Sequence, residues 1–170
     1  MLFAAALLLI QTAPAQACTA MDTGLPPALA AWTTPAQGSL DDLTRPVVLR
    51  SLKPEDQAKL DALPPVKTVG DARAALEKLK TFEAAQTGGM ARTGFRVEKA
   101  GRYGIALDQG GWIDVVGADG KSLESVEHGH GPDCSTIRKI VRFDLKRGAY
   151  RITLTKLTKP QARLMLVRGD

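Results

Sequence analysis

The chain has 170 residues, of which 44% are hydrophobic and 24% charged, and its formal net charge at neutral pH is +5. This length is that of one domain and is enough to bury a core without many staples. The lysines and arginines are scattered, and aromatic residues make up only 5% of the chain. The positive charge therefore does not predict nucleic-acid binding, which needs a basic stripe interleaved with aromatic residues.

Residues 1–17, MLFAAALLLIQTAPAQA, are predicted to be a secretory signal peptide. An apolar run is followed by Ala15-Gln16-Ala17, which suits signal peptidase cleavage before Cys18. The apolar run is shorter than the roughly 20 residues that a membrane span needs. The alternative to a signal peptide is a buried N-terminal helix. Cleavage leaves a single predicted domain, 18–170, in a periplasmic or secreted protein without a transmembrane span.

The mature chain keeps two cysteines, Cys18 and Cys134. In an oxidising compartment an even pair predicts a disulfide. This one closes a loop of more than 100 residues, worth nominally about 4–5 kcal/mol in the chain-entropy model. The alternative is lipidation of Cys18, which stands where a lipoprotein cysteine would stand but lacks the usual Leu three residues before it.

The first part of the mature chain contains few regular elements. Residues 18–46 are broken by Pro and Gly and are predicted to be loop-like, with Trp32 packed at the edge of the core. Residues 45–52, RPVVLRSL, form the first predicted strand, and residues 55–63, EDQAKLDAL, fit either a short helix or an alternating strand.

Residues 70–85, GDARAALEKLKTFEAA, are predicted to be a helix. Asp71 stands as a cap, and apolar residues from Ala72 to Phe82 follow near helical spacing. Residues 86–93, QTGGMART, are then expected to end it.

From residue 92 the pattern changes to short alternating strands between Gly and Asp turns. We predict two hairpins, one over residues 93–107 with its turn at 99–102, and one over 110–126 with its turn at 117–121. Further strands are predicted at 137–145, 146–155 and 162–168.

Two of these segments share a phrase, AGRYGIAL in one and RGAYRITL in the other. In both, Gly ends a turn, an aromatic residue two positions later enters the sandwich, and alternating aliphatic residues fill the inner face. Short strands at this spacing predict an antiparallel β-sandwich or jelly roll with one or two short helices, best defined over residues 92–168.

With these phrases, residues 92–168 resemble small exported β-sandwich modules attached to secreted bacterial enzymes, such as the prepeptidase C-terminal type. Such modules are usually non-catalytic. The resemblance implies a module that binds a ligand or a periplasmic protein.

A second resemblance rests on GWIDVV, on HGHGPDCSTIRKIVRFDL and on GAY. These residues are similar to a group of short exported alphaproteobacterial proteins, sphingomonad proteins above all. Members often carry the label homogentisate 1,2-dioxygenase. The label implies a non-haem iron held by two histidines and a glutamate. The fragment of this chain that matches is His128-Gly129-His130, followed by an acid at Asp133.

The residues themselves allow such a site. Two histidines at positions i and i+2 of a strand project to one face, where Glu127 or Asp133 would complete a two-His, one-carboxylate set for iron(II). A thiolate at Cys134 would make a zinc or copper set, but only with the disulfide open.

The competing interpretation is a structural loop. Gly129, Gly131 and Pro132 favour a tight loop over a regular strand, and a disulfide at Cys134 would pin it to the mature N-terminus. We therefore predict a non-catalytic ligand- or partner-binding module with no resident cofactor. The alternative is an iron-dependent dioxygenase that uses the His128–His130 loop, or a site there for another divalent metal.

Overall fold

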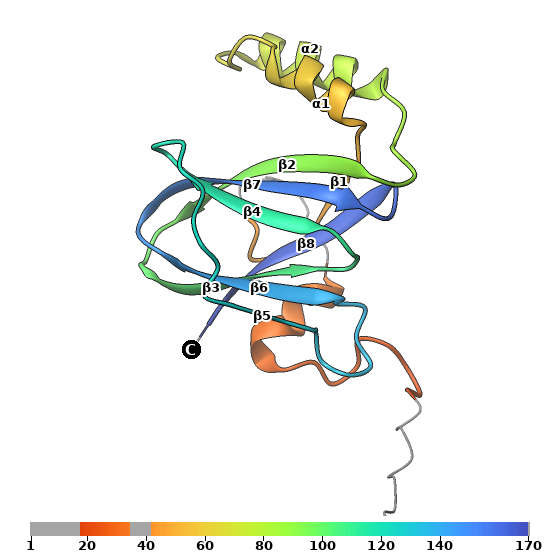
Figure 1. Cartoon of the computed structure of the whole chain (residues 1–170), viewed down its shortest axis with the longest axis vertical. Helices are drawn as coiled ribbons and strands as arrows, with labels where there is room; N and C mark the ends of the chain where they lie inside the picture. The colour runs from red at the N-terminus through yellow and green to blue at the C-terminus, as the bar shows by residue number, and fades with distance from the viewer. Residues whose placement is uncertain (1–17, 35–41, 170) are drawn as a thin grey trace, which may run out of the picture.

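The computed structural model describes residues 18–34 and 42–169, and these form two antiparallel β-sheets packed face to face (Figure 1). The predicted mainly β sandwich is confirmed. The five-stranded sheet has the order β1 (Val47–Arg50), β8 (Gln161–Arg168), β3 (Gly101–Leu107), β6 (Lys139–Leu145), β5 (Glu127–Gly129). The three-stranded sheet has the order β2 (Gly89–Val97), β7 (Gly148–Leu157), β4 (Trp112–Gly117).

The main core lies between the two sheets and follows the alternation of the sequence. Ile105 and Leu107 of β3 face Ile152 and Leu154 of β7, and all four side chains are fully buried. Burial of one such side chain is worth about 1.5–3 kcal/mol. The period-2 pattern of the strands therefore supplies the driving force that holds the sheets together.

The shared phrase has a common structural cause. In both copies the tyrosine hydroxyl donates a hydrogen bond to the backbone carbonyl four residues earlier, Tyr103 to Lys99 at 2.6 Å and Tyr150 to Lys146 at 2.9 Å. Each tyrosine thereby ties the start of its own strand, β3 or β7, to the turn before it. The aromatic residue was predicted to enter the sandwich, and its hydroxyl group also forms this hydrogen bond to the preceding turn.

The predicted hairpin over residues 93–107 is wrong. β2 pairs with β7, whereas β3 pairs with β6 and β8, so the turn at 99–102 carries the chain from one sheet to the other. β2 also begins at Gly89, inside the segment 86–93 that was expected to be a break. Alternation fixes which face of a strand is buried, but it does not select the partner strand.

The second predicted hairpin is half correct. The turn at 117–121 is closed by a 3.0 Å hydrogen bond from the Gly117 amide to the Lys121 carbonyl. Only one isolated bridge, between Val116 and Ser122, follows it. The chain then crosses to the other sheet, where it forms β5.

The region 18–46, predicted to be loop-like, contains one short 3-10 helix, η1 (Pro27–Thr33), within its described part. It covers part of the outer face of the five-stranded sheet and forms a second apolar cluster there. Trp32 is 0% exposed at the centre of this cluster, deeper than the predicted place at the core edge.

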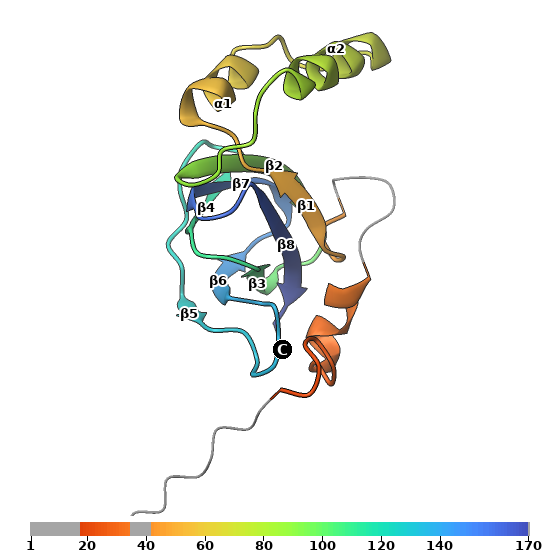
Figure 2. The same cartoon turned by 90° about the vertical axis from the view of Figure 1, so that its right-hand side faces the viewer.

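Two α-helices form an exposed hairpin beside β2, an edge strand of the three-stranded sheet (Figure 2). α1 (Pro54–Asp61) confirms the helical alternative for its segment. α2 (Val69–Lys80) is shorter than the predicted 70–85, and Thr68 is its N-cap, with Asp71 as the reciprocal partner in a capping box. No residue of α2 is buried, and Phe82, expected in the helix, is buried beyond its end.

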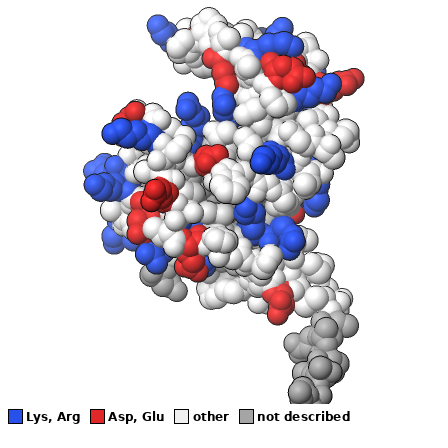
Figure 3. Space-filling model, viewed as in Figure 1, with Lys and Arg blue, Asp and Glu red and all other residues white. Residues whose placement is uncertain are grey.

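Within the described ranges, no helix is long and apolar enough to cross a membrane. The predicted signal peptide, residues 1–17, lies outside the described residues. Charged side chains of both signs are interspersed on the face shown in Figure 3, as expected of a solvated surface.

Candidate functional site

Two of the four residues proposed as metal ligands, Glu127 and His128, lie on opposite faces of the five-stranded sheet. His128 pairs in register with Val141, a core residue, so its side chain is on the inner side of the five-stranded sheet at its edge. Glu127 pairs with Arg142 on the outer side, where its carboxylate accepts a 2.9 Å hydrogen bond from the guanidinium. Successive strand residues face opposite sides, which separates this carboxylate from His128.

The other two candidates do not complete the set. His130 follows the end of β5, and its Nδ1 lies 3.3 Å from Nη1 and 3.4 Å from the carbonyl oxygen of Arg138. Asp133 is exposed in the following loop. Among the residues that the structure describes, no group of three or more His, Cys, Asp or Glu side chains is placed to hold a metal ion. The arrangement therefore does not fit the iron site that the dioxygenase label implies.

The loop is stapled to the N-terminal segment as predicted. Cys18 and Cys134 form a disulfide across a sequence separation of 116 residues. Asp22 reinforces it, because its carboxylate accepts 2.6 Å hydrogen bonds from both the backbone amide and the hydroxyl of Thr136. The indole N–H of Trp32 donates to the same hydroxyl oxygen at 2.8 Å. Covalent, polar and apolar contacts thus hold η1 against the sheet.

A hollow of about 490 Å³ opens on the outer face of the five-stranded sheet, between η1 and β5. We call it the arginine hollow. The side chains and glycine that matter to its chemistry are Arg102, Gly104, Glu127, His130, Arg142 and Arg168.

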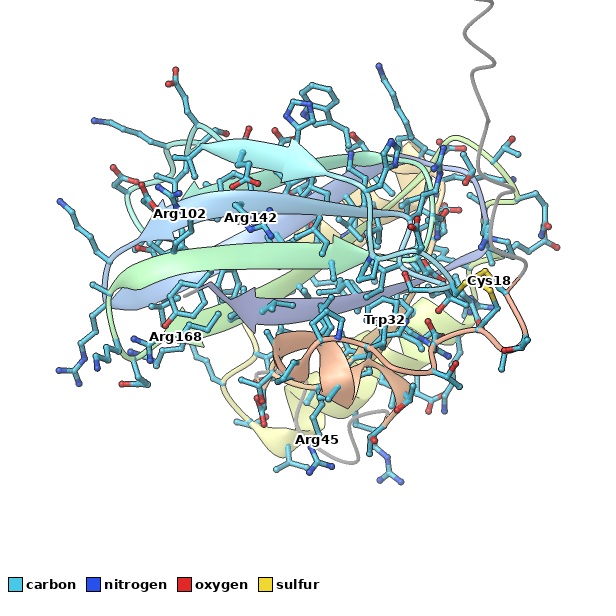
Figure 4. All side chains as sticks on the ribbon, turned by 90° about the horizontal axis from the view of Figure 1, so that it is seen from below. Cys18, Trp32, Arg45, Arg102, Arg142 and Arg168 are labelled. Atoms are coloured by element: carbon cyan, nitrogen blue, oxygen red, sulfur yellow. A yellow bond between two sulfur atoms is a disulfide. The ribbon has the colours of Figure 1, made fainter. Side chains whose placement is uncertain are left out.

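Figure 4 looks onto this face. Arg102 and Arg142 lie near one another over the strands, with Arg168 at the neighbouring end of β8, whereas Trp32 and Cys18 lie toward the opposite end. The disulfide-linked N-terminal segment therefore forms one wall of the hollow, and the arginines lie at the opposite wall.

The floor of the arginine hollow includes Gly104 of β3, a buried residue that is closely packed by its neighbours. A Cβ atom on Gly104 would lie 2.8 Å from Cγ2 of Ile140 and 3.7 Å from Cγ of Arg142. Any larger residue would have to displace the Ile140 side chain, which packs closely over this glycine, whereas its contact with Arg142 would be an ordinary one.

The charges of the arginine hollow are predominantly positive. The lining residues include three arginines and one acid, Glu127. Arg142 donates to Glu127, and Arg102 donates to Asp144 at 3.0 Å. Both pairs are solvent-exposed ion pairs, which are worth about 0–1 kcal/mol and yield readily to a better partner.

The Arg102–Asp144 pair stays charged over a wide pH range. Its hydrogen bond lowers the pKa of Asp144 and raises the pKa of Arg102. Each guanidinium has five donors, so one carboxylate leaves most of them free for another oxygen. Among the described residues, Arg168 has no ion-pair partner. Chemically, the hollow can bind a carboxylate, sulfate or phosphate group.

The arginines were missed at the level of the sequence. Arg102 and Arg142 are 40 positions apart, and only the pairing of β3 with β6 brings them to one place, with Gly104 opposite Arg142. A signal did exist, since both are arginines at outward positions beside core residues of their strands, Tyr103 in β3 and Val141 and Phe143 in β6. Alternation alone marks such residues as solvated and does not say that they gather.

Comparisons with protein-family models, with curated proteins and with solved structures found no significant match to this chain.

Proposed function

We propose that this protein is an exported, periplasmic β-sandwich module that is not an enzyme and binds a ligand through an acidic group held in the arginine hollow. The observation that carries the proposal is the gathering of Arg102, Arg142 and Arg168 around one hollow on the outer face of the five-stranded sheet. Export is supported by the disulfide, since such bonds persist in oxidising compartments.

Charge and geometry favour an oxyanion over a neutral ligand. Guanidinium groups bind carboxylate, sulfate or phosphate through two parallel hydrogen bonds, which are about twice as strong as neutral ones. The wall formed by η1 is fixed by the disulfide and Trp32, so the hollow is formed before the ligand arrives. A site that is already formed loses less free energy to ordering on binding.

Titration of the mature protein with sodium sulfate and with galacturonate, followed by amide and guanidinium NMR shifts, tests the proposal. We expect saturable shifts at Gly104 and Arg142 and an affinity weakened about tenfold or more in Arg142→Gln, since hydrogen bonds to charged groups are worth about 1.5–3 kcal/mol. Arg96→Gln removes the same charge from an exposed position on β2, in the other sheet, and is the matched control. If both variants lose affinity equally, the loss results from the lower overall charge of the protein and not from the arginine hollow.

The absence of catalysis is tested separately. Mature protein loaded with Fe(II) and offered homogentisate under oxygen is expected to give no ring-cleavage product. Stoichiometric product that depends on His128 and His130 would overturn the non-catalytic assignment.

A further inference from the structure

Two smaller hollows share lining residues with the arginine hollow in succession. A second hollow of about 280 Å³ shares His130 with it, and a third of about 170 Å³ shares His128 and Lys139 with the second. The three follow one another around the end of the short strand β5. We call the whole path the β5 track.

The far end of the β5 track is formed by an unusual tryptophan. Of the two tryptophans, Trp32 is fully buried, whereas Trp112 on β4 is 61% exposed. Its indole N–H donates to the carboxylate of Asp114 at 3.2 Å, which fixes the ring and satisfies its only donor. The remaining surface of the ring is apolar and open to a flat partner.

Polar groups surround this ring. His128 and Ser125 line the third hollow beside Trp112, and neither side chain has a hydrogen-bond partner within residues 18–34 and 42–169. The ammonium group of Lys139 lies in the same hollow and donates to the Gly111 carbonyl at 2.8 Å. An exposed ring edged by free donors and acceptors suits a ligand with an apolar face and a rim of hydroxyl groups.

Three of the seven residues that line the middle of the β5 track are glycines. Gly110, Gly111 and Gly129 stand where side chains would narrow it, and a Cβ on Gly129 would meet no heavy atom within 4 Å. The basic side chains of Arg138 and Lys139 border the same stretch. A chain-like ligand with negative charge can therefore continue from the arginine hollow to Trp112.

We infer that the ligand is an acidic oligosaccharide of several residues, with one uronate carboxylate in the arginine hollow and a further sugar ring stacked on Trp112. This inference rests on the proposed function and names the class of its ligand. A nucleic acid fits less well, because successive bases need successive aromatic platforms and the track has one. An acidic peptide fits less well, because β5 has only three residues and offers a short edge for strand addition.

The test compares galacturonate with its linear hexamer, using calorimetry for the hexamer and NMR titration for the monomer. We expect the hexamer to bind at least about tenfold more tightly, a gain of about 1.4 kcal/mol, because it adds a ring stacked on Trp112. Trp112→Ala should remove that gain and leave the monomer affinity unchanged. Trp112→Phe should keep part of the gain, and Arg142→Gln should weaken both ligands.

Control measurements distinguish a failure of the proposed function from a failure of the inferred ligand class. Val66→Ala, in the exposed helical hairpin, removes an exposed apolar side chain far from the track and should change neither affinity. Failure of the monomer and the hexamer to bind would overturn the proposed function together with the inference. Binding of the monomer without a gain for the hexamer, or a gain that survives Trp112→Ala, would overturn the inference alone. A maltohexaose, hexaglutamate or oligothymidylate that binds as tightly through Trp112 would overturn the assigned ligand class.

Discussion

The N-terminal segment and the helical hairpin both lie against the same sandwich, but they are held in opposite ways. Residues 18–34 have few local signals for structure, and η1 has no side-chain cap. They are nevertheless fixed by a disulfide, by Asp22 and by the buried Trp32. α2 has a complete capping box and basic residues in its last turn, yet it buries no side chain.

Local signals and placement in the fold are therefore independent properties of this molecule. A capping box favours a helical conformation of its segment, but only contacts with the sandwich hold a segment in one place. The hairpin is joined to the body chiefly through α1, by the ion pair of Asp61 with Arg92 and the burial of Gln57. The following changes test how far the two attachments differ.

Removal of the disulfide should have the largest effect. Replacing Cys18 and Cys134 together by serine is expected to lower the free energy of unfolding by about 4–5 kcal/mol, the loop-closure value for a loop of this length. Chemical denaturation of both proteins measures it. Hydrogen exchange should show the loss of protection concentrated in 18–34, and an unchanged segment 18–34 would mean that Trp32 and Asp22 suffice.

Truncation of Trp32 should come next. Trp32→Ala is expected to cost about 3–5 kcal/mol, since it leaves a cavity and removes the indole donor from Thr136. Leu76→Ala is the matched change in the hairpin, where the side chain is 52% exposed and the expected cost is within about 0.5 kcal/mol. Similar melting temperatures for the two variants would contradict the difference between the attachments.

Two glycines of the histidine loop form a third test. Neither has a positive φ, but a Cβ on Gly131 would overlap the Ile137 carbonyl oxygen and lie 2.6 Å from the Ile137 Cβ, whereas on Gly129 it would meet open space. Gly131→Ala should cost about 1–3 kcal/mol through overpacking. Gly129→Ala should be nearly neutral in thermal unfolding. Equal losses of stability in the two variants would show that the close approach of Gly131 to Ile137 is not what limits substitution in this loop.

Loss of the capping box should have the smallest effect on global stability. Thr68→Ala is expected to destabilise α2 by about 1 kcal/mol, visible as faster amide exchange in 69–80 with little change in the main melting transition. Hydrogen bonds from the Lys67 amide and from Thr68 lower the pKa of Asp71. Its contribution should therefore be present at neutral pH and be lost only as pH falls through that lowered pKa. A large drop in global melting temperature would show that α2 is part of the core.

The sequence of this chain predicts the elements whose causes are local. The alternation around Tyr103 and Tyr150 predicts inward-facing strands, and the Gly and Asp turns predict their ends. These features depend on the side-chain period and on turn residues, which neighbouring residues determine. The disulfide between Cys18 and Cys134 joins distant residues, and its prediction came from the number of cysteines behind a predicted signal peptide.

Partner choice was decided by the tertiary structure. β2 and β3 are consecutive but belong to different sheets, and the strand after the turn at 117–121 crosses to the other side. Arg102 and Arg142, 40 positions apart, thereby came together on the outer face of one sheet. Strand pairing depends on residues far apart in the sequence, because the inner faces of all the strands must fill one core together. A local pattern of residues therefore does not predict it.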